Sequence, residues 1–546
     1  MTSGVHLNLN QEYTGPEVFE MIQKIEAAKD EEFSNRQEEY EKEINILREQ
    51  LRLMQNHRFG RSSEKGSQFD HPDQLQLFPL GDEEQETIPS EEKEQKTITV
   101  KSHRRKKGGR QPFPDFFPEE TLELDIPEED KTCGCGCLKE RIGSEESRRL
   151  DYIPAQIKIL RTVRHKYICK NCEGLEDHGK PVVSVVPAPK HIIPRCLVSS
   201  RFLAMVMIGK YQDAIPFYRQ ENQLKRLQLD LPRATMAGWA IKIANALSDF
   251  IQLLHQNLLQ SRVIQMDETT LQVLKEKGRE PTTLSYLWVM KGGPPGKEIR
   301  YFHYAPSRSG EIAKTLLEHF QGVVQCDGYK GYDWMVRIDT IIRAGCMAHA
   351  RRKFVEALKA RSGGKKKKGN KKDRAQLVLD QIGELYKLEK RAKQEGLSDE
   401  ERKVFRQKEA RPILENLKQW LQDHKKIVVP SSLLGKAVDY MLKSWDRLTV
   451  YLDYGYVEID NNGVENSIRP VAVGRKNYLF SDSEGGAHAL AVMYTLIETA
   501  KANRIEPFEY LSMLFEKIPY ADSKEDLQRL FPWNLDPITH GLDTCA

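Results

Sequence analysis

The sequence lacks any stretch that suits a membrane or an export signal. No window of its 546 residues approaches the run of about 18 apolar residues that a membrane-spanning helix requires. The first residues, MTSGVHLNLNQEY, have neither a basic region nor an apolar core, so we expect no secretory signal there. These features predict a soluble, intracellular protein without a membrane partner.

An excess of one charge sign is also lacking. The chain has 84 Lys and Arg against 80 Asp and Glu, a formal net charge of +4. Overall charge therefore gives no indication of nucleic-acid binding, and only local clusters can do so. Hydrophobic residues make up 39% and charged residues 30%, which allows real cores beside solvated helices and linkers. At roughly 100–200 residues per domain, the length predicts about three to five units.

Cysteine is scarce, and its distribution argues against a disulfide framework. Five of the nine cysteines lie close together, in the run CGCGC and in a C-x-x-C pair, which indicates a metal site in a reducing compartment. Four thiolates from two such clusters are typical of a structural Zn²⁺ site in a zinc ribbon, here at 131–180. We expect Cys133, Cys135, Cys169 and Cys172 as the ligands, with Cys137 as a substitute in the first pair. Free thiols are the alternative.

The N-terminal 66 residues have a coiled-coil pattern. Apolar residues from Phe33 to Met54 recur with 7-4-3-4-3 spacing, an a/d seam of about three heptads. This predicts a leucine-zipper-like helix over 16–56 that joins the chain into a homodimer or higher oligomer. An amphipathic helix packed on its own chain is the alternative.

A linker at 67–130 follows and contains a basic arm. The run KSHRRKKGGR has six Lys and Arg and no acid, which favours an arm that orders on DNA phosphates. A solvated tail is the alternative. The expected DNA contacts in the arm are Arg104, Arg105, Lys106 and Lys107.

Three helical patterns occupy residues 190–255. The runs SSRFLAMVMIGKY, PFYRQENQLKRL and ATMAGWAIKIANAL each have an apolar face, and Pro232 separates the last two. A helix, a short turn and a helix led by Arg233 are typical of a helix-turn-helix, so we expect a DNA-binding domain with Arg233 near the DNA. A plain helical bundle is the alternative.

From residue 258 onward, strands and helices alternate. Three β-rich runs precede an amphipathic helix and a fourth strand, VVQC. The first three indicate an antiparallel meander, and the fourth returns through the helix, which places the first and fourth strands side by side. This is the ribonuclease-H-like arrangement. It brings Asp267, at the expected end of the first strand, next to Asp327, at the end of the fourth.

A third acid, Glu465, lies on a helix that an Asp-Asn-Asn cluster opens, and asparagine is a good N-cap. The long charged segment between Asp327 and Glu465 indicates a helical insertion in the core. The chain is thus expected to be a multidomain α+β protein. Its C-terminal half divides into 258–355 (core, first part), 356–455 (insertion), 456–505 (core, second part) and 506–546 (C-terminal segment).

Three converging carboxylates suit phosphodiester chemistry. Two Mg²⁺ ions about 3.5–4 Å apart can activate an attacking oxygen and stabilise the leaving oxygen, and Mg²⁺ prefers oxygen ligands. Neighbouring carboxylates repel each other, so a cation is their natural compensation. We therefore expect Asp267, Asp327 and Glu465 to be catalytic and to bind two Mg²⁺, for which Mn²⁺ can substitute. Separate solvation of each acid is the alternative.

Two clusters of basic residues lie near the predicted acids in the sequence. They lie after the motif Cys346-Met-Ala-His349 and after Glu465, where they can hold phosphates; a solvated face is the alternative. The C-x-x-H motif resembles half a zinc site, but no second pair is near in sequence, which favours a structural or DNA-orienting role. The expected phosphate contacts are Arg351, Arg352, Arg469, Arg475 and Lys476.

The runs MDETTLQV, CDGYKGYDWM, AGCMAHARRKF and NNGVENSIRPVAVGRKNYLF together resemble the insertion-sequence-66 transposase family. The resemblance covers nearly the whole chain. It implies an Asp-Asp-Glu catalytic set at Asp267, Asp327 and Glu465. It further implies cleavage of double-stranded DNA at the ends of a mobile element, and strand transfer into a target. It also implies a bacterial cell, with the protein in the cytoplasm beside the nucleoid.

Two other functions fit the same residues. One is a nuclease that cleaves without strand transfer, and the other is an inactive DNA-binding regulator from a decayed element. The zipper and the DNA-binding modules favour a transposase, since two ends must be held together. The sequence leaves open the end sequence, the target preference, the second-strand cut, the need for helper proteins and the assembly state beyond a dimer.

Overall fold

The computed structural model describes residues 15–59, 156–168, 183–362 and 373–535. The described residues fall into two units, with 15–59 and 191–535 in the first and 156–168 and 183–190 in the second. Within these ranges, no helix has both the length and the apolar character needed to cross a membrane. All five candidate zinc ligands and the basic arm at 101–110 lie outside the described residues.

The second unit contains two short antiparallel strands. β1 (Lys166–Ile168) pairs with β2 (Val183–Val185), and Tyr167 lies opposite Ser184. In the sequence, β1 ends just before Cys169, and β2 begins after Cys172. The two paired strands therefore flank the second pair of predicted zinc ligands.

The N-terminal helix α1 (Gly15–Phe59) is continuous over 45 residues. Its surface carries ion pairs at i,i+4 spacing, among them Arg36 with Glu32 at 2.7 Å, which support an isolated helix. The apolar positions of the predicted seam are exposed, with Phe33 at 71% and Leu47 at 57%. The helix expected over 16–56 is therefore present, and its self-association stays a prediction.

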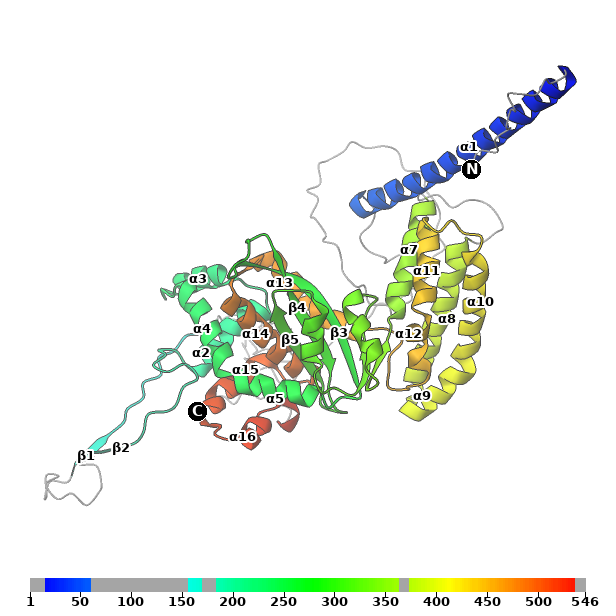
Figure 1. Ribbon diagram of the computed structural model, residues 1–546. Helices are drawn as coiled ribbons and strands as arrows, with labels where there is room; N and C mark the ends of the chain where they lie inside the picture. Colours follow the sequence, from blue (N-terminus) through cyan, green and yellow to red (C-terminus); the bar gives the residue numbers. More distant parts are fainter. Residues whose placement is uncertain (1–14, 60–155, 169–182, 363–372, 536–546) are drawn as a thin grey trace, which may run out of the picture. The chain divides into compact units, whose positions relative to one another are not determined.

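A mixed sheet forms the centre of the first unit (Figure 1), with the strand order β5-β4-β3-β6-β7. β3 is antiparallel to β4 and parallel to β6. The expected pairing of the first and fourth strands is therefore confirmed. A short strand, β8, pairs with the far end of β3. The bounds are β3 Val263–Lys275, β4 Leu284–Gly292, β5 Ile299–Ala305, β6 Gly322–Gln325, β7 Ile341–Ala344 and β8 Ser481–Ser483.

One detail of the first strand differs from the expectation. Asp267 does not end the strand, because β3 continues to Lys275 through its antiparallel ladder with β4. Only the parallel ladder with β6 stops earlier, at Gln265. Asp267 therefore lies just beyond the end of the parallel pairing, in the middle of a longer strand.

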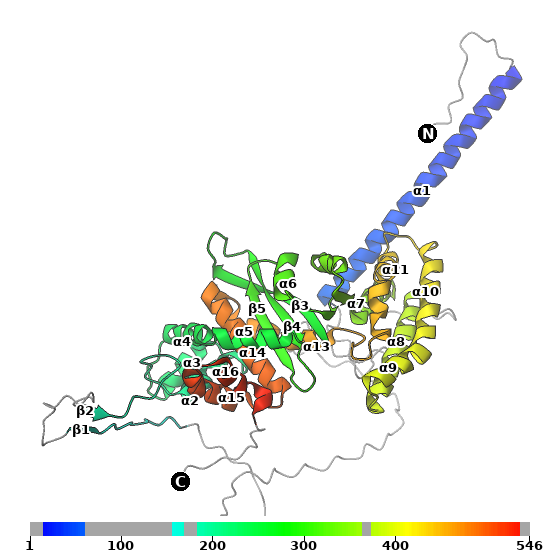
Figure 2. The same ribbon diagram turned by 60° about the horizontal axis from the view of Figure 1, so that its bottom comes forward.

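Helices cover the sheet and protect its edge. α13 lies against β3 and β4, and α14 lies along β5 (Figure 2). The hydroxyls of Thr495 and Thr499 on α14 accept hydrogen bonds from the backbone N–H groups of Phe302 and Arg300, which satisfies donors that an edge strand would otherwise expose. The helices of this part are α6 (Gly310–Leu316), α13 (Asn462–Tyr478), α14 (Glu484–Ala502), α15 (Pro507–Lys517) and α16 (Lys524–Arg529).

The helices expected within 190–255 are present. Their apolar faces join the same core as the sheet, α14 and α15. Pro232 is the N-cap of α4, and the Arg233 side chain that follows is exposed. The helices are α2 (Ser200–Tyr211), α3 (Phe217–Arg226), α4 (Arg233–Ala246) and α5 (Ser248–Leu258).

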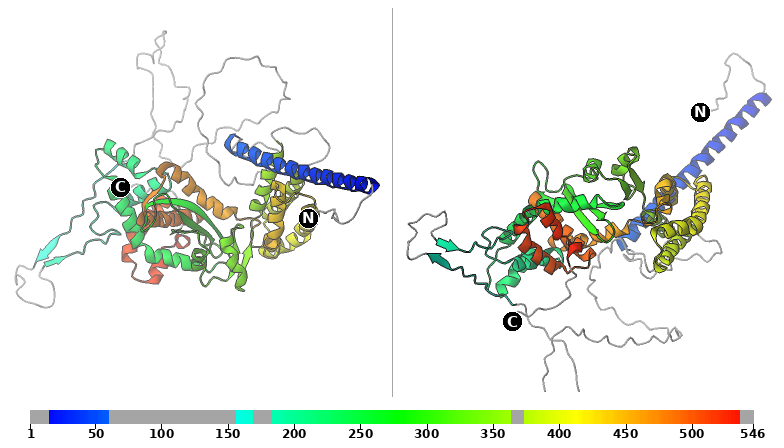
Figure 3. Two further views of the ribbon diagram at one scale, coloured as in Figure 1. Left: turned by 45° about the horizontal axis from the view of Figure 1, so that its top comes forward. Right: turned by 90° about the horizontal axis from the view of Figure 1, so that it is seen from below.

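The long segment between the two halves of the core is helical and has its own apolar core, which also includes sheet residues such as Val323 and Ala344. Figure 3 shows the yellow helices of this segment to one side of the green sheet, and their apolar core includes residues of β6 and β7. Inside them, the fully buried Arg406 pairs with Glu389 at 2.6 Å. The helices are α7 (Met347–Ser362), α8 (Arg374–Gln394), α9 (Asp399–Phe405), α10 (Arg411–Lys425), α11 (Leu433–Lys443) and α12 (Trp445–Thr449).

Candidate active site

The register of β3 and β6 aligns two of the three predicted acids. Gln265 pairs with Gln325 in the parallel ladder, and each glutamine is followed two positions later by an aspartate, Asp267 and Asp327. Side chains two apart on a strand share a face, and neighbouring strands lie about 4.8 Å apart. Asp267 lies on β3, whereas Asp327 lies two residues beyond the end of β6. The negative charge of Asp327 contributes to the pKa of Asp267, so the two carboxylates lie near each other.

The two glutamines also hold the helix that carries the third acid. Gln265 Oε1 accepts a hydrogen bond from the Val464 backbone N–H at 3.1 Å, and its Nε2 donates to Gln325 Oε1 at 2.9 Å and to the Asp460 carbonyl at 3.1 Å. Gln325 Nε2 donates in turn to the Glu458 carbonyl at 2.7 Å. We call this pair the glutamine clasp. It fixes the start of α13 over the sheet, and so it fixes Glu465.

The helix start needs a glycine and is capped differently from the expectation. A Cβ at Gly463 would lie 2.5 Å from Gln265 Oε1 and 2.5 Å from Lys291 Nζ, so a larger residue there would displace the Gln265 side chain from its hydrogen bonds. Asn461 is the N-cap, but within the described structure its side chain makes no capping hydrogen bond. Instead, the Asp460 carboxylate accepts from the Asn462 backbone N–H at 3.0 Å, and the Tyr386 hydroxyl donates to it at 2.7 Å.

Glu465 is a buried acid whose carboxylate is unpaired. Its side chain is 3% exposed, and both carboxylate oxygens are without a hydrogen-bond partner among the residues that the structure describes. Burial, and next the negative charge of Asp267, raise its pKa to about 9. A buried polar group without a partner costs on the order of 1–3 kcal/mol, and more when charged, so this carboxylate calls for a cation.

Asp267 is a second acid whose pKa is raised by burial and by neighbouring negative charges. Burial, followed by the negative charges of Glu268 and Asp327, raises its pKa to about 8. Asp267 Oδ1 accepts one hydrogen bond, from the Glu268 backbone N–H at 2.9 Å, and Asp327 Oδ1 accepts one from Tyr329 N–H at 2.9 Å. Asp267 and Asp327 both contribute to the raised pKa of Glu465. The structure thus brings the three predicted acids together.

Two neighbouring acids have structural partners. The Glu268 carboxylate, 1% exposed, accepts from Arg308 Nε and from the Tyr332 hydroxyl, both at 2.6 Å. Asp333 pairs with Arg343 at 2.6 Å. These pairs neutralise the two carboxylates, whereas Glu465 has no such partner in the described part of the chain.

The start of α7 supplies groups that face Glu465. His349 Nδ1 lies 3.6 Å from Glu465 Oε1. Burial, and next the charge of Arg352, lower the pKa of His349 to about 4, so its imidazole is neutral at pH 7. Arg352 also acts on the pKa of Glu465, which places its positive charge beside the acids. The sequence suggested a role for the C-x-x-H motif but did not predict its contact with the third acid.

The other residues that were predicted to contact phosphates differ in how far they are exposed to solvent. Lys476 is exposed and Arg469 is half-buried on α13. Arg351 is only 9% exposed. The Arg475 guanidinium donates to the carbonyl and hydroxyl of Thr270, so it ties α13 to β3. Arg352 and Lys476 therefore have better access to a phosphate than Arg351 and Arg475 have.

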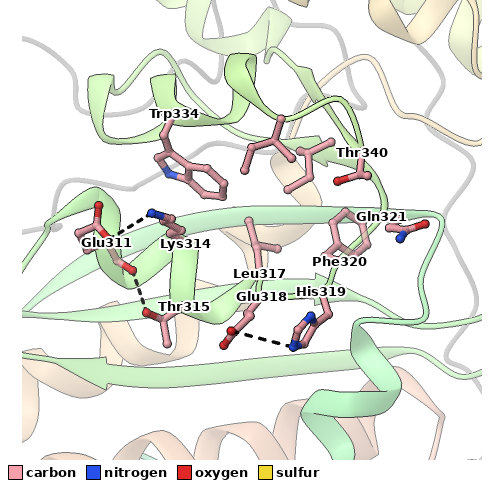
Figure 4. Close-up of a pocket in the computed structure, with 12 residues that line it drawn as sticks. Glu311, Lys314, Thr315, Leu317, Glu318, His319, Phe320, Gln321, Trp334 and Thr340 are labelled. Carbon is pink, nitrogen blue, oxygen red and sulfur yellow. Dashed lines mark hydrogen bonds and ion pairs between the residues drawn. The ribbon is translucent and has the colours of Figure 1, made fainter.

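A separate pocket of about 370 Å³ lies between α6 and the 3₁₀ helix at Lys330–Arg337. Figure 4 shows Lys314 of α6 and Leu317, which directly follows the helix, on one side and Trp334 on the other. Its described lining includes none of the three acids, so the pocket is not the site of their chemistry.

Comparisons with known proteins cover most of the chain. A family model described as "Transposase IS66 family" matches residues 195–489, and "IS66 C-terminal element" matches 495–533. "Zinc-finger binding domain of transposase IS66" matches 130–173, and "Transposase C of IS166 homeodomain" matches 46–121. The zinc-finger match contains all five candidate thiol ligands, which supports zinc binding there.

Curated relatives come from Sinorhizobium fredii (strain NBRC 101917 / NGR234). "Uncharacterized protein y4hP" is 30% identical over 510 residues, 90% of this chain and 88% of the relative. "Uncharacterized protein y4jD" is 30% identical over 435 residues, 77% of this chain and 81% of the relative. The similarity therefore extends over most of both chains.

Proposed function

The chain belongs to the insertion-sequence-66 family of transposases, and on that premise we propose that it cuts the ends of its mobile element and joins them to target DNA. Asp267, Asp327 and Glu465 are the proposed catalytic acids of a ribonuclease-H-like core. The parallel pairing of β3 with β6 supports that assignment, because it aligns Gln265 with Gln325, and each glutamine stands two positions before one of the aspartates.

The observation that carries the proposal is the unpaired carboxylate of Glu465 beside Asp267. Both of its oxygens are buried and lack partners in the described structure, and the neighbouring acid raises its pKa. Buried like charges persist where a cation compensates them. The donor set is all oxygen, which suits Mg²⁺, and Mn²⁺ can replace it.

When bound, two Mg²⁺ ions supply activation of the attacking oxygen and stabilisation of the leaving oxygen. The chain supplies their position. Asp267 on β3 and Asp327 just after β6 would hold them from one side, and Glu465 would hold them from α13, which the glutamine clasp keeps in place. Arg352 adds a positive charge next to Glu465 that can hold a phosphate of the DNA.

The remaining modules have proposed roles in assembling the DNA complex. Self-association through the exposed seam of α1 would hold two element ends together. The zinc ribbon and the basic arm at 101–110 would bind the ends, with the arm contributing phosphate contacts.

The proposal is tested by comparing cleavage with binding on end-containing DNA. Asp267→Asn, Asp327→Asn and Glu465→Gln should each abolish Mg²⁺-dependent cleavage, while affinity for the ends, measured by fluorescence anisotropy, stays near wild type. Glu458→Gln is the matched control, since Glu458 is exposed and pairs with Arg402 at 3.5 Å. Near-wild-type cleavage by Glu465→Gln would show that the third ligand lies elsewhere.

A further inference from the structure

Three metal-binding side chains meet where α7 and α13 begin. Cys346 directly precedes α7, His349 lies in its first turn, and Glu465 lies in the first turn of α13. The ligand atoms of all three lie within 4.8 Å of one another, and His349 Nδ1 is 3.6 Å from Glu465 Oε1. The C-x-x-H motif has no second pair near in sequence, but the fold provides a third ligand from a distant helix.

Two of these three side chains have polar atoms without a hydrogen-bond partner in the described structure. Both oxygens of Glu465 and Nδ1 of His349 are buried and lack hydrogen-bond partners within the described ranges. Cys346 is 2% exposed, and its Sγ accepts a hydrogen bond from the Asn461 backbone N–H at 3.5 Å. Burial, and next the negative charges of Asp460 and Glu465, raise the pKa of the Cys346 thiol well above its usual value, and the Asn461 N–H opposes this shift only in part. The carboxylate is more than nine-tenths buried, so water does not satisfy it.

We propose that Cys346, His349 and Glu465 form a binding site for one zinc-class ion, distinct from the zinc ribbon and overlapping the proposed Mg²⁺ site at Glu465. Thiolate and imidazole ligands select Zn²⁺, whereas Mg²⁺ takes oxygen ligands. Tetrahedral Zn²⁺ with bonds of about 2.0–2.3 Å sets its ligand atoms roughly 3.4–3.7 Å apart. The His349–Glu465 separation already fits, and the sulfur needs a shift on the order of 1 Å.

Three protein ligands leave a fourth position for water, and binding at neutral pH releases two protons to solvent, one from the Cys346 thiol and one from the Glu465 carboxyl group. Glu465 belongs to both sites. Zinc binding itself does not depend on the proposed catalysis. Its consequence does rest on the proposed function: an ion bound to Cys346 and His349 draws Glu465 away from the Mg²⁺ ions, so zinc inhibits cleavage.

The test uses full-length protein in which Cys133, Cys135, Cys137, Cys169 and Cys172 are replaced by serine, which removes all five candidate thiol ligands of the ribbon. Co²⁺ is titrated in the absence of DNA, and thiolate-to-cobalt charge-transfer absorption is recorded. We expect one equivalent to bind with this absorption. Cys346→Ser should abolish it, while Cys196→Ser, a half-buried cysteine outside the site, should not change it. His349→Ala and Glu465→Gln should each weaken Co²⁺ affinity more than about 100-fold, beyond the 10–100-fold effect typical of an outer-shell partner.

Charge-transfer absorption that is absent from the folded protein, or that survives Cys346→Ser, would overturn the proposal. The first result requires no variant at the site, so misfolding of Cys346→Ser cannot obscure it. Circular dichroism reports the fold in each case. A protein that binds Co²⁺ here but does not cut DNA contradicts only the proposed function, and one that cuts DNA without the absorption contradicts only this site.

Discussion

Replacing Glu465 by glutamine should stabilise the metal-free protein at neutral pH, although it removes a proposed catalytic group. Burial, with Asp267 next, raises the pKa of Glu465 from 4.5 to about 9. A carboxyl group whose pKa is higher in the folded state binds its proton more tightly there. Its contribution to stability is therefore fully present below about pH 4.5 and is lost as the pH rises towards 9.

The size of the effect follows from the pH interval. Each pH unit between the unfolded and the folded pKa lowers the free energy of unfolding by about 1.4 kcal/mol. The interval from pH 4.5 to pH 7 spans about 2.5 pH units, so the wild-type protein loses on the order of 3 kcal/mol of stability across it. Glutamine does not titrate, so the free energy of unfolding of Glu465→Gln should not fall in this way. Its excess over the wild-type value should grow by on the order of 3 kcal/mol between pH 4.5 and pH 7. The side chain is 3% exposed, so solvent screening reduces this value little.

Scanning calorimetry in EDTA at several pH values, for both proteins, measures the effect. Mg²⁺ should raise the unfolding midpoint of wild type but not of the variant, because a ligand stabilises only the state that binds it. Glu389→Gln is the matched control with the opposite sign. It removes the charge that pairs with the fully buried Arg406, whose guanidinium then keeps only uncharged hydrogen-bond acceptors such as the Tyr451 and Tyr454 carbonyls, and it should cost about 3–5 kcal/mol. A Glu465→Gln difference that does not change with pH would refute the reasoning.

Three further predictions concern other parts of the chain. Gln265→Leu breaks the glutamine clasp and should lower cleavage at least tenfold with end affinity unchanged; equal cleavage would show that α13 is held without it. Leu47→Glu with Leu51→Glu charges the exposed seam of α1 and should shift the mass measured by light scattering towards monomer. Replacing the basic residues at 104–107 by alanine should flatten the dependence of log affinity on log salt; an unchanged slope would exclude the arm from DNA contact.

Much of the core could be predicted from local patterns. Apolar β-rich runs separated by one amphipathic helix indicate both the strands and the parallel return, and the structure confirms the pairing of β3 with β6. The true end of β3 could not be predicted, because its length depends on a ladder with β4, which is a tertiary contact. The helices of 190–255 share one apolar core with the sheet. The sequence could not predict this either, because it depends on tertiary packing.

The sequence predicted the three acids that the structure brings together, and their catalytic role stays a prediction, but it did not predict the residues that hold them in place. Glutamine on a strand resembles any half-exposed polar residue, and only the register shows that Gln265 and Gln325 meet. A signal was present, since Gln265-Met-Asp267 and Gln325-Cys-Asp327 repeat one pattern. The contact of Cys346 and His349 with Glu465 could not be foreseen, because it joins two helices far apart in sequence.

The most direct test of the central claim is a strand-transfer assay with wild-type protein, Mg²⁺, pre-cut element-end DNA and a target plasmid. The account predicts covalent joining of the end to the plasmid, dependent on Mg²⁺ and abolished by Asp327→Asn. Cleavage of uncut ends without joining would indicate a nuclease. Binding with neither reaction would indicate a regulator, and either result would contradict the account.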